Sequence, residues 1–221
     1  NPSLVGSEMC IRDSFDGGFQ ELSIKVNGEP AEINLVGTHV RINLKDPIHT
    51  GESTKLMIEW AYALVEENAV RARNGYETFE DGNDIFLLAQ WYPRVTVFSD
   101  YEGWHNKEFV GRGEFTLEFG DFEVDITVPA DHIVAATGTL QNQDDVLSST
   151  QKRRMKKAKN SSKPIFIVTP EEAYENEVEK SAEYKTWSFK AENVRDFAWA
   201  SSRKFIWLSL IHISEPTRLG F

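Results

Sequence analysis

Apolar and polar residues alternate with a period of two along most of this chain, and this alternation constrains the fold more than any other feature. Leu22, Ile24 and Val26 alternate with polar residues, and Asn27-Gly28 follows them. Successive side chains of a β-strand point to opposite faces, so this period predicts a strand with one buried face. An Asn-Gly pair after such a run predicts a hairpin, because both residues tolerate a positive φ.

The same pattern recurs in both halves of the chain. Alternating groups are Ile33 and Leu35; Val40, Ile42 and Leu44; Leu56, Ile58, Trp60 and Tyr62; Phe115, Leu117 and Phe119; Phe122, Val124, Ile126 and Val128; and Thr186–Lys190. Short apolar runs at 85–90, 133–136 and 165–168 predict further strands, and Gly120-Asp121 predicts a turn. Packing two sheets is the natural way to bury so many half-buried strands. We therefore expect a mostly β fold, an antiparallel β-sandwich or saddle.

A short helical insertion is expected at about 142–183. Asn142 can cap a helix that carries Asp144 and Asp145 in its first turn and the basic run 152–159 at its carboxyl end. Thr169, with Pro170 after it and Glu172 three positions on, predicts a capping box that opens a second helix. The basic run is typical of a nucleic-acid patch when it lies in a basic domain, but here a solvated helix is the better interpretation.

The two ends of the chain are related as DNA although they look unrelated as protein. Residues 208–218 can be encoded by a string whose reverse complement translates to Leu4–Asp13. Met9 and Cys10 leave almost no codon freedom, so agreement along the whole stretch is informative. An inverted repeat of this kind resembles a transposase-type sequencing adapter. We therefore expect residues 1–14 and 208–221 to be adapter-derived and not native, and residues 15–207 to form one β-domain.

Charge and cysteine content narrow the function classes. The chain carries 24 basic and 35 acidic residues, a net charge of −11. Without the two terminal segments, which hold two basic and three acidic residues, the net charge is −10. An acidic domain repels phosphate backbones, so no nucleic-acid partner is expected. The only cysteine is Cys10, in the adapter, so neither a disulfide nor thiol chemistry is expected; no membrane segment is visible, and no compartment is indicated.

Four stretches resemble the amino-terminal domain of the aminopeptidase N family, gluzincin metallopeptidases, and most closely its bacterial members. They are Gln90–Arg94, Gly103–Asn106, Phe119–Pro129 and Glu192–Ala200. The likeness covers essentially all of residues 15–207. The resemblance implies that Glu192–Ala200 lies on the last strand before a catalytic domain. It also implies a parent enzyme that removes amino-terminal residues from peptides, using a zinc ion held by two histidines and a glutamate.

This chain departs from the family where the chemistry would be. The histidines of residues 15–207 are His39, His49, His105 and His132; none is followed by Glu and none is paired at a spacing of four. We therefore expect no catalytic residue, no metal ligand and no cofactor in this chain, with zinc belonging to the full-length parent. The expected partners are its own catalytic domain and, in the parent, a peptide substrate.

One residue of this domain is a candidate for substrate contact. In the family a short stretch reaches the cleft, where a Gln or Glu binds the amino group of the peptide, and Gln90 is the positional match. A buried amide that satisfies the end of a strand is the rival interpretation, and both stay open. Trp91, Tyr92 and Trp104 could line a peptide cleft, although core aromatics are the commoner use.

Three loops invite other chemistry, and each has a simpler interpretation. Glu80–Asp84 offers oxygen ligands but lacks the spacing of a calcium hand, so a solvated turn is expected. Gly111-Arg-Gly113 lacks the strand–loop–helix context of a phosphate loop, so a turn or bulge is preferred. His105 would need metal-binding partners, and the sequence near it supplies none.

The alternative function is a free-standing β-sandwich module that binds peptide or glycan. A natural module is expected to end in a solvated linker, whereas residues 15–207 stop in the apolar run Phe205–Trp207. That run favours a domain cut from a larger enzyme. A third alternative, an inactive family member that acts as a scaffold, differs only in the sequence that would follow.

Overall fold

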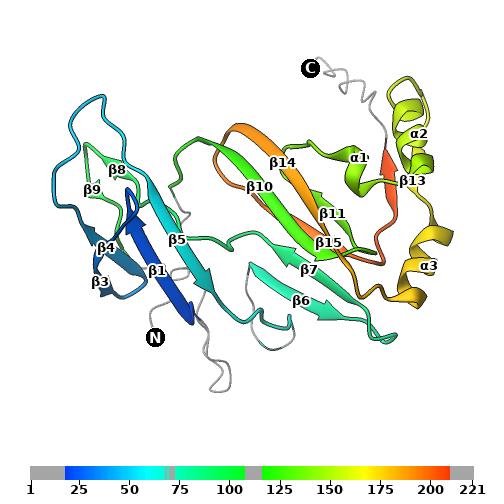
Figure 1. Ribbon diagram of the computed structural model, residues 1–221, viewed down its shortest axis with the longest axis horizontal. Coiled ribbons are helices and arrows are strands. Elements are labelled where there is room, and N and C mark those ends of the chain that lie inside the picture. The colour runs from blue at the N-terminus through cyan, green and yellow to red at the C-terminus, as the bar shows by residue number, and fades with distance from the viewer. Residues whose placement is uncertain (1–17, 68, 70–72, 108–115, 210–221) are drawn as a thin grey trace, which may run out of the picture. The chain divides into compact units, whose positions relative to one another are not determined.

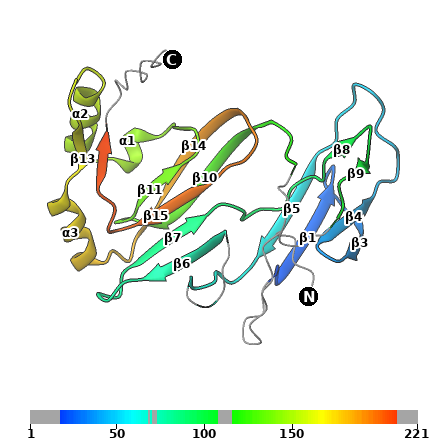
Figure 2. The same ribbon diagram turned by 180° about the vertical axis from the view of Figure 1, so that it is seen from behind.

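A computed structural model describes residues 18–67, 69, 73–107 and 116–209 of the chain. The fold is mostly β, with antiparallel sheets and a short helical insertion, which confirms the predicted class. The chain divides into two compact units. Unit 1 comprises Asn1–Glu77 and Leu87–Glu118, and unit 2 comprises Thr78–Phe86 and Phe119–Phe221. Figures 1 and 2 show the elements of both units from opposite sides.

Unit 1 is built from short hairpins. Its strands are β1 (Glu21–Val26), β2 (Glu29–Pro30), β3 (Glu32–Val36), β4 (His39–Asn43), β5 (Leu56–Ala61), β6 (Asn74–Thr78), β8 (Phe98–Ser99) and β9 (Gly103–Trp104). β1 lies between β2 and β5, while β3 pairs with β4 and β8 pairs with β9. Asn27 and Gly28 have φ of 50° and 91°, so the Asn-Gly pair makes the predicted turn between β1 and β2.

Unit 2 contains the longest strands of the described chain. β10 (Gly120–Pro129) pairs with β14 (Tyr184–Val194), which also pairs with β12 (Thr139–Leu140). In a second sheet β15 (Trp199–Ser202) lies between β11 (Ile133–Ala136) and β7 (Asp84–Leu88). Both sheets contribute buried side chains to the core of the unit, among them Ile126, Val134 and Trp187.

Gly138 lies at a position that admits no side chain. Its φ is +90°, and a Cβ atom there would lie 2.8 Å from the Cβ of Ala191 and still closer to the carbonyl oxygen of Lys190. β11 and β12 are joined through this residue, and β12 then pairs with β14. The connection therefore depends on glycine, both for its backbone conformation and for the close approach of two chains.

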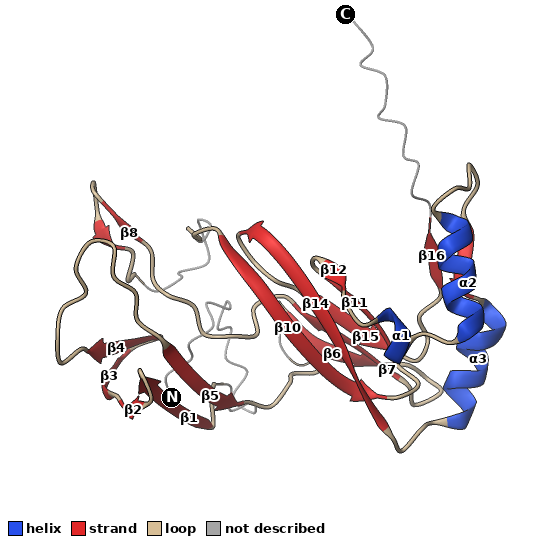
Figure 3. Ribbon diagram, turned by 45° about the horizontal axis from the view of Figure 1, so that its top comes forward, coloured by secondary structure: helices blue, strands red, loops and turns tan. Residues whose placement is uncertain are grey.

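The helical insertion contains three helices and one strand. α1 is Gln143–Val146, α2 is Ser149–Ala158, β13 is Ile165–Val168 and α3 is Pro170–Glu179. Figure 3 shows the helices in blue. Thr169 and Glu172 form the predicted reciprocal capping box at the start of α3.

The prediction of one helix capped by Asn142 was wrong. The Asn142 side chain makes no cap; it donates to the carbonyl of Thr186 and accepts from the N–H of Ser188, each at 2.9 Å, and so ties the loop to β14. The helix is interrupted at Leu147, and Ser148 opens α2 with its own capping box to Gln151. A second capping signal, six residues after the first, divides the segment.

Two strand predictions also differ from the structure. Residues 116–119 are not in a strand, and β10 begins at Gly120, where a bulge replaces the expected turn; Phe115 lies outside the described residues. Arg195 and Asp196, expected on one strand, lie between β14 and β15. The Arg195 guanidinium lies 4.7 Å from the centre of the Phe119 ring, at the distance of a cation–π contact.

β16 (Trp207–Ser209) pairs with β13 and extends two residues past the predicted domain boundary at 207. Trp207 pairs with Val168, Leu208 with Phe166 and Ser209 with Ile165. Because backbone groups make this ladder, it can form whether Leu208 and Ser209 are native or adapter-derived.

Candidate functional site

Gln90 follows β7 in unit 1, in the segment that the sequence singled out. Its backbone carbonyl accepts a hydrogen bond from Nδ2 of Asn74 at 2.9 Å. Its side-chain Oε1 is buried and has no hydrogen-bond partner. This bond closes the end of the strand through the backbone carbonyl and not through the side-chain amide, so both interpretations of the Gln90 side chain stay open. The side-chain oxygen Oε1 is an unsatisfied acceptor, because no group among the described residues donates a hydrogen bond to it.

An aromatic cluster accompanies Gln90 in unit 1. Phe19 contacts both Tyr62 and Trp60, with ring centres 5.7 and 6.2 Å apart, and Trp60 contacts Trp91 at 6.3 Å. Nε1 of Trp60 also donates to the carbonyl of Trp91 at 3.2 Å, and Trp91 packs edge-on against Tyr92 at 5.1 Å. The rings of this cluster are half-buried, so Trp91 and Tyr92 are neither fully enclosed core residues nor free surface residues.

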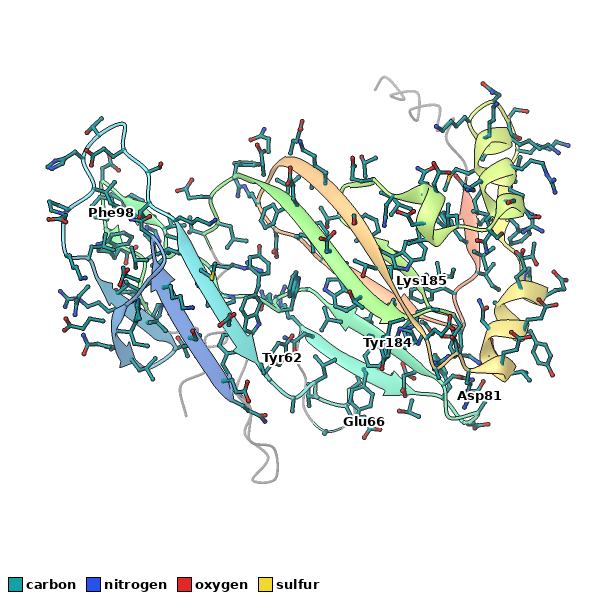
Figure 4. The ribbon with its side chains drawn as sticks, in the orientation of Figure 1. Tyr62, Glu66, Asp81, Phe98, Tyr184 and Lys185 are labelled. Atoms are coloured by element: carbon teal, nitrogen blue, oxygen red, sulfur yellow. The ribbon has the colours of Figure 1, made fainter. Side chains whose placement is uncertain are left out.

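Two groups fix the electrostatics beside this cluster. Arg94 lies over the Tyr92 ring, 5.0 Å from its centre, and its Nη2 donates to the carbonyl of Ala89 at 3.4 Å. Burial raises the pKa of Tyr62 to about 12, so its phenol stays protonated and uncharged at neutral pH. Tyr62 is labelled in Figure 4. Neither Arg94 nor Tyr62 is therefore poised as a nucleophile or base near pH 7.

The β8–β9 hairpin carries exposed aromatic rings. Phe98 is 60% exposed, Tyr101 79% and Trp104 57%, and the Phe98 and Trp104 rings meet edge-on at 5.2 Å. Phe98 is labelled in Figure 4. The preferred interpretation of Trp104 as a core residue was therefore wrong: it pairs with Phe98 across a two-residue ladder that has no further strand over it.

His105 is held within the same hairpin. Its Nε2 lies 2.8 Å from Oγ of Ser99, and its ring packs edge-on against Tyr101 at 5.6 Å. The N–H of His105 donates to the carbonyl of Val97 at 2.9 Å. These contacts give His105 a local structural role in stabilising the hairpin.

Unit 2 contains a Ser–His pair that the sequence did not reveal. Nδ1 of His132 lies 2.8 Å from Oγ of Ser201, and Asp131 accepts from Arg203 Nε at 3.0 Å and from the N–H of Ser181 at 2.6 Å. His132 and Ser201 are only 2% and 1% exposed, so substrate cannot reach the serine. Burial, and secondarily the charge of Arg203, lower the pKa of His132. The pair is a buried structural contact and not a nucleophile with its base.

Asp81 anchors the turn at residues 80–84 to the rest of unit 2. Nζ of Lys204 lies 2.5 Å from Oδ2 of Asp81 and 2.9 Å from Oε2 of Glu177, which joins this turn to α3. The Lys204 hydrogen bond is the main cause that lowers the pKa of Asp81, which is labelled in Figure 4. Asn83 is buried, and its Nδ2 donates to the carbonyl of Glu177 at 3.4 Å. The turn acts as a structural clamp.

No metal centre is assembled from the described residues, since nowhere among them do three or more His, Cys, Asp or Glu side chains gather to hold an ion. Gly111-Arg-Gly113 lies outside the described residues.

Neither a protein-family model, nor a curated protein, nor a solved structure matches this chain. Within the described residues, no helix is long and apolar enough to cross a membrane.

Proposed function

We propose that residues 15–207 are the amino-terminal, non-catalytic part of a zinc-dependent aminopeptidase of the aminopeptidase N type. In this proposal the chain packs on and caps the catalytic domain, and Gln90 contacts the free amino group of the peptide substrate. Zinc and the catalytic residues belong to the full-length parent. The sequence motifs described above support the family, and the unpartnered Oε1 of Gln90 carries the role of this domain.

A buried amide oxygen without a donor is costly. Leaving such an acceptor unsatisfied costs about 1–3 kcal/mol, because its hydrogen bonds to water are lost and not replaced. Oε1 is closed off in the free chain, so an N–H group supplied by a ligand removes that cost only when the side chains around Gln90 move to admit it. A free peptide amino group offers such donors, and an uncharged amide accepts them without needing a particular protonation state. Gln90 would thus orient the substrate amino group without taking part in bond breaking.

Exposed apolar side chains support the second part of the proposal. Phe119 and Ile206 in unit 2 are 57% and 50% exposed. Exposed large apolar residues favour a contact with another protein domain over exposure to water. The catalytic domain of the parent is the partner that the resemblance implies.

The test uses the full-length protein recovered from the intact gene. Its hydrolysis of an amino-acid anilide with a free amino group is compared with that of the same anilide after acetylation. We expect the acetylated compound to be inert, and Gln90→Ala to raise KM about tenfold, the equivalent of one lost hydrogen bond. Gln20→Ala is the matched control, because Gln20 is an exposed glutamine of the same unit.

Two results would overturn the proposal. A full-length protein that does not hydrolyse free-amino anilides removes the aminopeptidase assignment. An active protein in which Gln90→Ala behaves like Gln20→Ala removes the role of Gln90 while leaving the enzyme class in place.

The alternative function, a free-standing module that binds peptide or glycan, is favoured by a different observation. Phe98, Tyr101 and Trp104 present exposed rings on one hairpin, and such rings stack on sugars and on proline-rich or aromatic peptides. Titration of the tryptophan fluorescence with oligosaccharides and with peptides tests this alternative. Saturable binding that Trp104→Ala abolishes and Gln90→Ala leaves intact would favour the module over the enzyme domain.

A further inference from the structure

Helix α2 presents a basic face that is not neutralised within the described residues. Its exposed cations are Arg153, Lys156 and Lys157, with Lys159 at the carboxyl-terminal cap. At 3.6 residues per turn these positions lie on one side of the helix, opposite the buried Ala158. We call these four residues the basic face.

The other two cations of α2 are already paired. Lys152 Nζ lies 2.9 Å from Oδ1 of Asp144, and Arg154 Nη1 lies 2.5 Å from Oε2 of Glu172. No ion pair joins the four residues of the basic face to an acidic side chain in the part of the chain that the structure describes. Arg153 and Lys157 stand four residues apart, a spacing at which like charges destabilise a helix. A partner that supplies negative charge would relieve this repulsion.

Helix α3 presents the complementary surface. Its exposed residues are Glu171, Tyr174, Glu175, Val178 and Glu179, which again share one side of the helix. Tyr174 and Val178 are 66% and 63% exposed. We call these five residues the acidic face. Its inner side is occupied elsewhere, since Ala173 is buried and Glu177 holds Lys204.

The two faces match in charge and in spacing. Arg153 and Lys157 are four residues apart, as are Glu175 and Glu179, so each pair spans about 6 Å along its helix axis. The apolar stems of lysine and arginine can cover Tyr174 and Val178, and a guanidinium over the Tyr174 ring adds a cation–π contact. Among the described residues of one chain, an ion pair joins these helices at Arg154 and Glu172, which lie on neither face.

We propose that this chain associates with a second copy of itself through these faces, with the basic face of one copy on the acidic face of the other. A two-fold arrangement would use both contacts at once, because each copy carries both faces, on the neighbouring helices α2 and α3 that Figure 3 shows in blue. The net charge of −11 on each copy opposes association at long range. That repulsion is screened beyond about 8 Å at physiological salt, whereas the local contacts between the faces persist.

The test is sedimentation equilibrium of the 221-residue chain in a non-ionic detergent that suppresses apolar association. We expect the apparent mass to rise with concentration from 25.2 kDa towards twice that value. Raising NaCl from about 0.05 to about 0.5 M is expected to weaken association about tenfold, since salt screens ion pairs. Association that strengthens with salt would be apolar and would overturn the proposal.

Charge reversal identifies the surfaces. Arg153→Glu/Lys157→Glu and Glu175→Lys/Glu179→Lys are each expected to be monomeric alone, with helical content checked by circular dichroism. An equimolar mixture of the two variants is expected to associate again, because each restores the complement that the other lost. Glu29→Lys/Glu118→Lys is the matched control: it makes the same charge change at exposed positions of unit 1 and should still associate.

The contradicting results are distinct. A wild-type chain that stays monomeric at about 100 µM, well above a micromolar Kd, overturns the proposal. So does a mixture of the two variants that fails to associate. A monomeric chain that instead binds phosphatidylserine vesicles through α2 would assign the basic face to a membrane and not to a second copy. None of these results bears on the aminopeptidase proposal, which the sequence motifs and Gln90 support.

Discussion

Nδ1 of His132 lies 2.8 Å from Oγ of Ser201, and the two side chains are almost completely buried between β11 and β15. The other ring nitrogen, Nε2, has no hydrogen-bond partner. The imidazole therefore occupies a site that favours its neutral form, with Phe86 against it and Arg203, Asp131, Asp84 and Lys185 as the nearest charges.

His132 makes the stability of the fold depend on pH. Its pKa is lowered from the ordinary value of 6.5, so the unfolded chain binds a proton at pH values where the folded chain does not. The free energy of unfolding should therefore decrease as pH falls from 6.5 to the lowered pKa, and this contribution should be constant below that pKa. Urea unfolding at a series of pH values measures the slope, and NMR titration of the imidazole measures the pKa directly. An imidazole that titrates at 6.5 or above would contradict the account.

Ser201→Ala should destabilise unit 2 by about 1–3 kcal/mol, because it leaves a second nitrogen of a buried imidazole without a partner. Chemical denaturation provides the measurement. Ser149→Ala is the control, since Ser149 is an exposed serine of the same unit. Equal stability of the two variants would show that the 2.8 Å contact contributes nothing.

Gly138→Ala should be strongly destabilising, by about 2 kcal/mol or more, because it combines an unfavourable positive φ with overpacking against Ala191. Gly28→Ala is the matched comparison: Gly28 has a φ of +91°, but nothing lies within 4 Å of the added atom. Only the backbone term of about 1 kcal/mol is expected there. If thermal unfolding shows the two variants to be alike, the close approach at Gly138 is not real.

Phe197→Ala should destabilise unit 2 by about 3–5 kcal/mol, since the ring is fully buried and packs 6.0 Å from that of Phe122. Phe197 belongs to the stretch Glu192–Ala200 that carries the family resemblance. Its burial gives that motif a packing role within this unit. A loss below about 1 kcal/mol in urea unfolding would contradict that role, because core truncations rarely cost so little.

The exposed rings of the β8–β9 hairpin should make the isolated chain bind hydrophobic dyes. Phe98→Ser/Trp104→Ser should reduce dye fluorescence by more than Leu87→Ser, which removes a single exposed apolar side chain of the same unit. A monodisperse wild-type chain that does not increase the fluorescence of the dye would count against an exposed apolar surface that binds a partner.

The period of two was sufficient to predict the mostly β class and strands such as β1, β5 and β10, because side chains alternate between the two faces of a strand. It did not predict β6, and residues 116–119 alternate without forming a strand. The Asn27-Gly28 turn and the Thr169 capping box were also predictable, since local hydrogen bonds determine both. A hydrogen bond between residues distant in sequence was not predictable. The side chain of Asn142 accepts from the N–H of Ser188 on β14 and therefore does not cap a helix. Exposure at the hairpin was equally hidden, because nothing near Trp104 in sequence reveals which strand, if any, covers it.

The candidate site was predictable only in part. The resemblance selected Gln90, but its environment comes from Trp60 and Asn74, which are distant in sequence. His132 and Ser201 were missed because 69 residues separate them and no short motif joins them.

The measurement that tests the central claim most directly is the coding sequence on the far side of Trp207, obtained by sequencing across the intact gene. The account predicts a downstream His-Glu-x-x-His motif with a distal Glu, the ligands and base of a zinc aminopeptidase. A stop codon shortly after Trp207 would contradict it and would leave the free-standing binding module as the leading function.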